Sequence, residues 1–281
     1  MSPLEPPPGD RFRYTTLGHR DHGLCSPLAG AKLQRLLARL QLGRGDVALD
    51  LAGGKGLLAR AVAELTGARA LVVDANPWFL AEGRAALRDA AASPGLAADL
   101  EDLVHVRARS GAGGAVEFLE GDVADHAEDA VCFAPGGAAL VACVGARPFG
   151  DRAATLGALV GLTRPGGQVL VGEGYWRDGP DAGLLELFGG HDAAEAGETF
   201  EGHPRLAEEL GLSLVWAHGV TTAELTDYDR RFCGALAGWC GEHPDDPDAA
   251  AFAERVATWE GHMVRRGRAA MGFGWYLYRR P

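Results

Sequence analysis

Residues 47–59 read VALDLAGGKGLLA, and this stretch decides the fold. The apolar run Val47–Leu51 predicts a buried strand, and the glycines that follow it predict a tight turn. Residues 57–65 return to helical spacing, and Ala70–Val73 predicts a second buried strand that ends at Asp74. A strand, a glycine-rich turn, a helix and a second strand within some thirty residues form a βαβ unit.

The same alternation continues toward the C-terminus. Further strands are predicted at Val116–Glu120, Ala139–Val144 and Gln168–Val171, with a helix at Ala153–Leu162. Five strands of this kind, mostly parallel and separated by helices, predict an α/β fold with a doubly wound sheet and helices on both faces. Two more strands, Leu212–Val220 and Phe273–Tyr278, enclose a helical pair, which we interpret as an insert over residues 222–270.

Composition excludes several classes of protein. The chain has 281 residues, 41 of them glycine without a collagen period, and a net charge of −11, which argues against nucleic acid and anionic membranes as partners. No apolar run approaches the roughly 18 residues that a transmembrane helix needs. The start, MSPLEPPPGD, lacks the features of a signal peptide, and five scattered cysteines indicate reduced thiols in a cytoplasmic protein. We expect a flexible proline-rich segment over residues 1–18 and one domain over residues 19–281, with a lid and helix at 19–43.

The glycine-rich turn predicts a nucleotide-type cofactor, of which two kinds fit. Gly54–Ala59 matches G-x-G-x-x-A, the dinucleotide pattern, and Asp74 follows Gly56 by 18 residues, where an acid suits a ribose diol. Asp50 argues against the dinucleotide interpretation, because that strand is normally apolar in such folds. A Walker A site is excluded, since Gly56 rather than serine or threonine follows Lys55.

Several segments together resemble one known family. Asp50–Gly56 resembles the D-x-G-x-G-x-G motif of class I S-adenosylmethionine (SAM) dependent methyltransferases. Three other segments match that family in order and spacing: Asp74, Glu120-Gly121-Asp122 and Pro165-Gly166-Gly167. Two more, Val171–Trp176 and Gly274–Tyr278, are similar to segments of its bacterial small-molecule branch. The sequence departs from the motif at Ala52, where the family has its first glycine, and Lys55 is expected to point away from the ligand.

The resemblance implies a seven-stranded sheet with an antiparallel last strand, a helical insert that covers the site, and SAM as cofactor. It implies that Asp50 and the glycines hold the methionine end, Asp74 the ribose hydroxyls and Asp122 the adenine amino group. Cys143 and Val144 would line the methionyl pocket. The cofactor residues carried over are Asp50, Ala52, Gly53, Gly54, Gly56, Asp74, Ala75, Gly121, Asp122, Val123, Cys143 and Val144.

Candidate residues for the chemistry follow the fifth strand. Glu173 and Tyr175 are the predicted catalytic residues, since the carboxyl ends of parallel strands are where such sheets bind ligands. Predicted acceptor contacts are Trp176, Tyr228 and Trp239, although the last two also fit a helix core. His19, His22 and Cys25 suit a lid beside the cofactor or plain N-terminal packing, and as a zinc site they lack a fourth ligand. We predict no metal.

We therefore expect a SAM-dependent methyltransferase that moves a methyl group to a small molecule by direct in-line displacement. No nucleic acid or membrane partner is expected, and a homodimer stays open. Two alternatives stay open as well: an NAD(P)-dependent oxidoreductase on a similar βαβ unit, and a SAM-binding protein without catalysis, which Ala52 motivates.

Overall fold

A computed structural model describes residues 5–92, 114–126, 136–177, 199–262 and 267–281. These residues form two compact units. The first unit comprises Met1–Pro27, Gly174–His203 and Gly219–Gly274, and the second comprises Leu28–Glu173, Pro204–His218 and Trp275–Pro281. Each unit is described by itself below.

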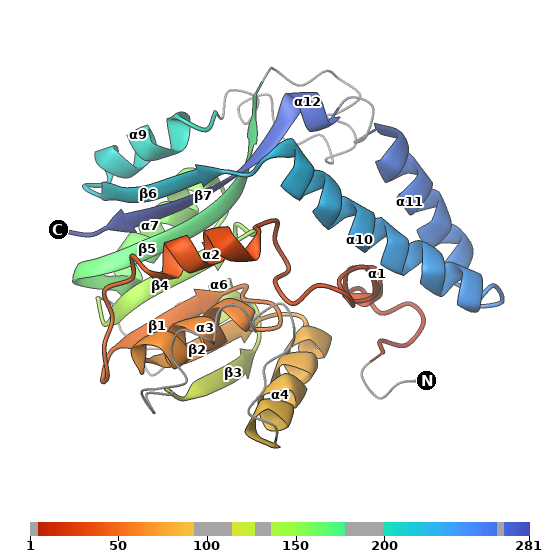
Figure 1. The fold of residues 1–281 in the computed structure, drawn as a ribbon, viewed down its shortest axis with the longest axis horizontal. Helices are drawn as coiled ribbons and strands as arrows, with labels where there is room; N and C mark the ends of the chain where they lie inside the picture. The colour runs from red at the N-terminus through yellow and green to blue at the C-terminus, as the bar shows by residue number, and fades with distance from the viewer. Residues whose placement is uncertain (1–4, 93–113, 127–135, 178–198, 263–266) are drawn as a thin grey trace. The chain divides into compact units, whose positions relative to one another are not determined.

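A seven-stranded sheet organises the second unit (Figure 1). The strands are β1 (Val47–Leu51), β2 (Arg69–Asp74), β3 (Val116–Glu120), β4 (Ala138–Val144), β5 (Thr163–Trp176), β6 (Ser213–Gly219) and β7 (Met271–Arg279). Their order across the sheet is β3-β2-β1-β4-β5-β7-β6, and the pairs from β3 to β5 are parallel. This order places the glycine-rich turn after the interior strand β1, which lies beside β4 where the winding of the sheet reverses direction.

Strand β7 runs against its neighbour β5. Arg280 and the turn at Gly166 and Gly167 exchange backbone hydrogen bonds at one end, and the Arg177 N–H donates to the Ala270 carbonyl at the other. The numbering therefore rises along one strand as it falls along the other, which is the antiparallel arrangement. The prediction of a mostly parallel, seven-stranded sheet with an antiparallel last strand is confirmed.

Helices flank the sheet in the second unit. They are α2 (Gly30–Leu37), α3 (Leu57–Thr66), α4 (Pro77–Ala92), α6 (Val123–His126), α7 (Arg152–Leu162) and α9 (Gly202–Glu209). Helix α3 packs on β1 and β2, α4 packs on β2 and β3, and α7 packs on β4. The side chain of Asp151 caps α7 by accepting from the Ala154 N–H at 2.7 Å, as aspartate at an N-cap does.

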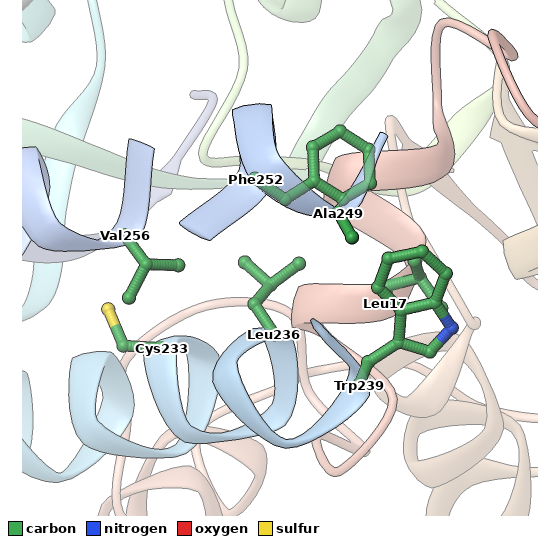
Figure 2. Close-up of a cluster of buried hydrophobic side chains, with 7 residues drawn as sticks. All are labelled: Leu17, Cys233, Leu236, Trp239, Ala249, Phe252 and Val256. Carbon is green, nitrogen blue, oxygen red and sulfur yellow. The ribbon is translucent and has the colours of Figure 1, made fainter. Parts of the chain in front are cut away.

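The first unit is built from α1 (Arg13–Gly18), α10 (Thr222–Glu242), α11 (Ala249–His262) and α12 (Arg268–Ala270). A reciprocal capping box starts α10: Thr221 accepts from the Glu224 N–H at 3.2 Å, and Glu224 accepts from the Thr221 N–H at 2.9 Å. Figure 2 shows the apolar cluster of this unit, which gathers side chains from α1, α10 and α11: Leu17, Cys233, Leu236, Trp239, Ala249, Phe252 and Val256. The helical insert thus has a core of its own.

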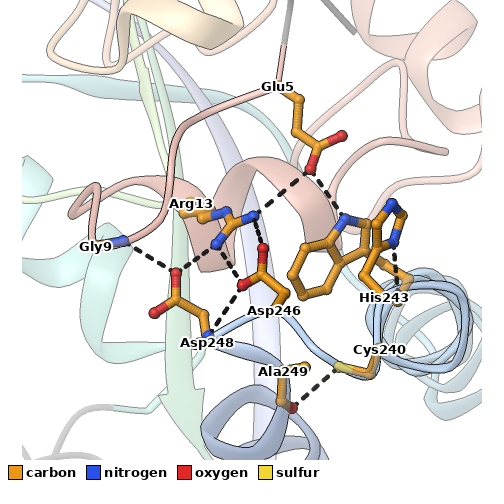
Figure 3. Close-up of polar contacts among 9 residues, drawn as sticks. Glu5, Gly9, Arg13, Cys240, His243, Asp246, Asp248 and Ala249 are labelled. Carbon is orange, nitrogen blue, oxygen red and sulfur yellow. Dashed lines mark hydrogen bonds and ion pairs between the residues drawn. The ribbon is translucent and has the colours of Figure 1, made fainter. Parts of the chain in front are cut away.

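Arg13 ties the N-terminal segment to the turn between α10 and α11 (Figure 3). Its guanidinium donates to Asp246 through two N–H groups, both at 2.7 Å, and to Asp248 at 2.6 Å. It also lies 4.7 Å from the ring centre of Trp239, whose indole N–H donates to Glu5 at 3.0 Å. The Arg13 side chain is only 2% exposed. We refer to Arg13, Asp246 and Asp248 as the Arg13 cluster.

Arg13 of this cluster lies in the segment over residues 1–18 that we expected to be flexible. From Glu5 onward the segment is described, and α1 buries Arg13, Thr16, Leu17 and Gly18. A helix as short as α1 shows no periodicity in the sequence. Its contacts with α10, α11 and the turn between them include the buried bidentate ion pair of Arg13 and the apolar side chain of Leu17.

Cys25, Cys143, Cys233 and Cys240 are free thiols, and Cys132 lies outside the described residues. In the described ranges, no helix has both the length and the apolar character that crossing a membrane requires.

Candidate functional site

The loop from β1 to α3 adopts a left-handed backbone at alternate residues. Ala52 has φ 53°, Gly54 has φ 58° and Gly56 has φ 71°. Glycine adopts these angles without a steric penalty, whereas alanine does so at a cost of about 1–2 kcal/mol. Among the described residues Ala52 is the only non-glycine with positive φ. The loop therefore keeps its glycine-type conformation at the position where the sequence departs from the motif.

Asp50 lies beneath this loop and is 5% exposed. Its carboxylate accepts the backbone N–H of Ala59 in the first turn of α3, while its Oδ2 is buried without a hydrogen-bond partner. A Cβ on Gly53 would lie 2.7 Å from the Asp50 Cγ and 2.8 Å from Oδ2, so only glycine leaves the carboxylate in place. A buried oxygen without a partner in a glycine-lined loop is an arrangement that suits a ligand donating hydrogen bonds.

The pKa of Asp50 is raised to about 7, chiefly because the carboxylate is buried; the Ala59 N–H opposes this shift, and the negative charge of Asp74 adds to it. Among the described residues neither Asp50 nor Asp74 belongs to an ion pair. The loop therefore holds two acidic groups without a counter-ion, and a cationic ligand would stabilise both in their charged form.

Asp74, at the end of β2, is held by the backbone on both sides. Its Oδ2 accepts from the Gly54 N–H at 2.8 Å and its Oδ1 accepts from the Asn76 N–H at 2.8 Å. Burial raises the pKa of Asp74, and these two N–H groups oppose the shift. Each oxygen retains a lone pair, so the carboxylate is oriented and still able to accept from a diol.

Lys55, which we expected to point away from the ligand, forms an ion pair with Glu82 of α4 at 2.6 Å. Its ammonium also lies 5.9 Å from the ring centre of Phe79. Its charge is thereby neutralised on the α4 side of the loop, which agrees with that expectation.

Gly83 of α4 supports the loop, and the sequence reasoning missed it. A Cβ at this position would lie 2.6 Å from the Lys55 carbonyl oxygen and 2.6 Å from the Phe118 ring. Only glycine therefore allows α4 to approach the loop this closely. A lone glycine in a predicted helix interior was the available signal.

Gly83→Ala should lower the free energy of unfolding by about 1–3 kcal/mol, because the added methyl group forces α4 away from the Lys55 carbonyl. Gly157→Ala in α7 is the matched control: a Cβ there meets nothing within 4 Å. That change should raise stability by about 0.5–1 kcal/mol, since alanine is the better helix former. Urea denaturation measures both, and equal stabilisation by the two changes would contradict the close approach.

The third predicted acidic segment follows β3. The Gly121 N–H donates to the Asp74 carbonyl at 3.1 Å, which joins this segment to the end of β2. Asp122 is exposed and accepts from the Ala124 N–H at 2.9 Å, while Val123 is buried. Ala75, between these acids in sequence, is half-buried.

Cys143 and Val144 end the strand that neighbours β1. Cys143 pairs in register with Leu51, directly before the loop, and it is 1% exposed. Burial, together with the charges of Asp50, Glu173 and Asp74, raises the pKa of the Cys143 thiol far above its usual value. Cys143 is therefore an inert, uncharged side chain rather than a nucleophile.

Glu173, a predicted catalytic residue, is 4% exposed and lies in ion pairs. Its Oε2 accepts from Arg147 at 3.1 Å and from the Nε of Arg152 at 2.9 Å. Two guanidinium groups stabilise the carboxylate, which favours a role in positioning over proton transfer. Neither arginine was singled out from the sequence, where nothing distinguished them from surface residues.

Tyr175 and Trp176 lie at the end of β5 in the first unit, and both are half-buried. The Tyr175 ring packs against Phe200, with ring centres 5.4 Å apart. Cβ atoms on Gly272 and Gly219 would lie 2.3 Å from the Tyr175 ring and 3.3 Å from its hydroxyl. Two glycines thus make the space that the tyrosine occupies.

Tyr228 of α10 brings together the three residues singled out near the N-terminus. Its hydroxyl lies 2.6 Å from the Nε2 of His19 and 3.1 Å from the Cys25 carbonyl, and its own carbonyl lies 3.2 Å from the Nε2 of His22. The segment is therefore packed on α10.

In the parts of the chain that the structure describes, no group of three or more histidine, cysteine, aspartate or glutamate side chains is arranged to hold a metal.

Trp239 is 1% exposed and belongs to the apolar cluster of Figure 2. An enclosed ring offers no surface to a ligand. Trp239 is therefore a core residue, and the predicted contact with the acceptor does not fit its burial.

Comparison with known proteins bears on this geometry. No family model matches the chain. It is 23% identical over 266 residues to the uncharacterized protein YjhP of Escherichia coli K12, covering 93% of this chain and 96% of that protein. The X-ray structure of YjhP matches with a TM-score of 0.74 at 22% identity, covering 96% of this chain and 100% of that one.

Two methyltransferase structures match equally well. The SAM-dependent methyltransferase of Geobacter sulfurreducens, in complex with S-adenosyl-L-homocysteine, has a TM-score of 0.74 at 24% identity, covering 99% of this chain and 100% of that one. That of Thiobacillus denitrificans, with the same ligand, has a TM-score of 0.74 at 20% identity over 96% and 98% of the two chains. The chain therefore has the Rossmann-like fold of SAM-dependent methyltransferases.

Proposed function

We propose that this protein is a SAM-dependent methyltransferase that acts on a small molecule, with its cofactor site at the loop between β1 and α3. The observation that carries the proposal is the buried, unpartnered Oδ2 of Asp50, which lies under a glycine-lined, left-handed loop and next to a second acid, Asp74. A ligand with an ammonium group, a sulfonium and a ribose diol supplies what these groups lack.

The residues present divide the work of holding SAM. Asp50 would accept from the ammonium, and the absence of a Cβ at Gly53 leaves the Asp50 carboxylate in place to do so. Asp74, already oriented by Gly54 and Asn76, would accept from the ribose hydroxyls. Exposed Asp122 would accept from the adenine amino group, and Cys143 and Val144 would line the methionyl pocket. When bound, SAM supplies a methyl group activated by the sulfonium.

The same geometry argues against a dinucleotide. In dinucleotide-binding folds the pyrophosphate lies at the N-terminus of the helix after β1, where backbone N–H groups point at it. Here Asp50 accepts the Ala59 N–H in that first turn, and a carboxylate at this place repels a phosphate.

The comparisons support the methyltransferase class, because two structures with the same fold are SAM-dependent methyltransferases with S-adenosyl-L-homocysteine bound. The net charge of −11 supports a small acceptor over nucleic acid. Methyl transfer is an in-line displacement at the methyl carbon. It depends on the alignment of acceptor and methyl group and on the exclusion of water more than on a proton acceptor. We therefore assign Glu173 to positioning through Arg147 and Arg152, while a contribution from Tyr175 stays a prediction.

Asp74→Ala should weaken binding of S-adenosyl-L-homocysteine about 100-fold, because the charge-assisted bonds to the ribose are lost. The fold should persist with a loss of about 1–3 kcal/mol, since two backbone N–H groups lose their acceptor. Calorimetry with the 2′-deoxy analogue separates these effects. The native protein should prefer the ligand with both hydroxyls, and the variant should not distinguish the two. Unchanged discrimination in the variant would place the ribose elsewhere.

Methyl transfer itself is tested by incubating the protein with SAM and a panel of small amines, alcohols, thiols and carbon acids. Release of S-adenosyl-L-homocysteine that depends on one acceptor supports an enzyme. Saturable cofactor binding with no transfer across the panel would instead favour a SAM-binding protein without catalysis.

A further inference from the structure

A groove of about 610 Å³ lies within the first unit, among α1, α10 and α11. Its lining includes the aromatic rings of Tyr14, Tyr228, Phe232 and Trp259. Tyr14, Phe232 and Trp259 also pack against the apolar cluster of Figure 2, so the groove borders a firm core. Its volume falls in the range of small-molecule sites.

The aromatic walls of this groove are held in place from behind. The rings of Tyr14 and Phe232 pack edge to face with centres 5.6 Å apart, and Tyr14 packs against Phe252 in the same manner at 5.2 Å. The Tyr228 hydroxyl is engaged with His19 and the Cys25 carbonyl. Fixed aromatic rings lose little entropy when a ligand binds, and their faces carry negative potential.

The charges in the groove favour a cation. Its lining includes two carboxylates, Asp229 and Glu254, and one guanidinium, Arg255. That guanidinium lies 3.7 Å from the ring centre of Tyr14, so one aromatic wall already holds a cation within the chain itself. The remaining aromatic walls and the exposed Glu254 carboxylate offer a similar environment to a cation from outside.

We propose that this groove binds a small organic cation, an alkylammonium group of the size of trimethylammonium, between the aromatic walls and beside Glu254. A desolvated cation is attracted to the negative face of an aromatic ring, and a neighbouring carboxylate adds to this attraction. The proposal goes beyond methyl transfer, because it concerns the ligand of the groove and holds whatever the loop after β1 binds.

Choline and its neutral isostere 3,3-dimethylbutan-1-ol are the probes, since they share shape and differ in charge. Titration of the full-length protein, followed by the NMR shift of the Trp259 indole, should show choline binding about tenfold more tightly, as about 1.4 kcal/mol of cation–π and carboxylate attraction implies. Equal affinity for both probes would show that the groove recognises apolar shape and not charge. No choline binding at tens of millimolar would show that the groove does not bind such a cation. Either result overturns the proposal.

Two neighbouring variants should move choline affinity in opposite directions. Glu254→Gln should weaken choline binding about threefold, and Arg255→Gln should strengthen it about threefold, because an exposed charge contributes only modestly to the affinity. Both side chains are exposed, so both variants should fold. A structural effect would shift both affinities alike, and that outcome contradicts the proposal. Both variants should bind S-adenosyl-L-homocysteine with the affinity of the native protein. Failure of the groove proposal is thereby distinguished from failure of the proposed cofactor site.

Discussion

Asp50→Asn should make the protein more stable at pH 8 while it abolishes cofactor binding. Affinity for S-adenosyl-L-homocysteine should fall about 100-fold or more, because the ligand's ammonium loses a buried carboxylate and its charge is left without a partner. The unliganded protein should gain on the order of 2 kcal/mol at pH 8, because the variant no longer buries a charge there. Calorimetry and urea denaturation measure the two effects.

The gain in stability should depend on pH in a defined direction. Burial raises the pKa of Asp50 to about 7 from 3.8, so the folded state binds its proton more tightly than the unfolded chain does. The contribution of Asp50 to the free energy of unfolding of the native protein therefore falls as pH rises from about 4 to about 7, and it is constant above that. The difference between variant and native protein should grow over the same interval and nearly vanish at pH 4.

Asp125→Asn is the matched control for this variant, because Asp125 is an exposed acid on α6. It should change neither affinity nor stability. An Asp50→Asn protein that binds S-adenosyl-L-homocysteine as the native protein does, or that is less stable at pH 8, would contradict the role assigned to Asp50.

Arg13→Met should lower the free energy of unfolding by about 2–4 kcal/mol at pH 7. Methionine keeps the apolar stem but leaves the carboxylates of Asp246 and Asp248 without a counter-ion, and breaking a largely buried pair is strongly destabilising. Fluorescence-detected denaturation reports the loss. Arg11→Met, at an exposed position two residues earlier, should change stability by less than about 0.5 kcal/mol.

A pH series distinguishes this electrostatic effect from lost packing. The Arg13 guanidinium lowers the pKa of Asp246, and the Gly9 N–H together with Arg13 lowers the pKa of Asp248. Lowered carboxyl pKa values contribute stability above the unfolded value of about 4, and that contribution is lost as pH falls through the folded values. The deficit of the variant should therefore be full at pH 7 and shrink below pH 4. A deficit that stays constant from pH 7 to pH 3 would assign it to packing.

Much of the fold could be predicted because its strands are buried and end in polar or glycine signals. The predicted strand Val116–Glu120 has the observed bounds, and Val47–Leu51 does as well. The helix expected within residues 19–43 is short, since α2 spans only Gly30–Leu37. Ala29, the residue before α2, has an extended backbone and forms no side-chain cap, so no capping residue marks this start in the sequence.

The candidate site was predictable in its acids and glycines but not in the side chains that support them. Asp50 and Gly53 belong to one short motif, and Asp74 is the acid that ends the next buried strand. Glu82, Arg147 and Arg152 act through contacts across 27, 26 and 21 residues of sequence, and no local pattern encodes such pairs. The buried state of Trp239 was equally hidden, because a helical aromatic stripe fits a core and a ligand wall alike.

The central claim is that the loop between β1 and α3 binds SAM, and titration of the native protein with S-adenosyl-L-homocysteine by calorimetry tests it most directly. The account predicts saturable binding of one ligand per chain, weakened as pH falls below about 7 and Asp50 becomes protonated. No heat of binding at millimolar ligand, or binding of NAD(H) in its place, would contradict it.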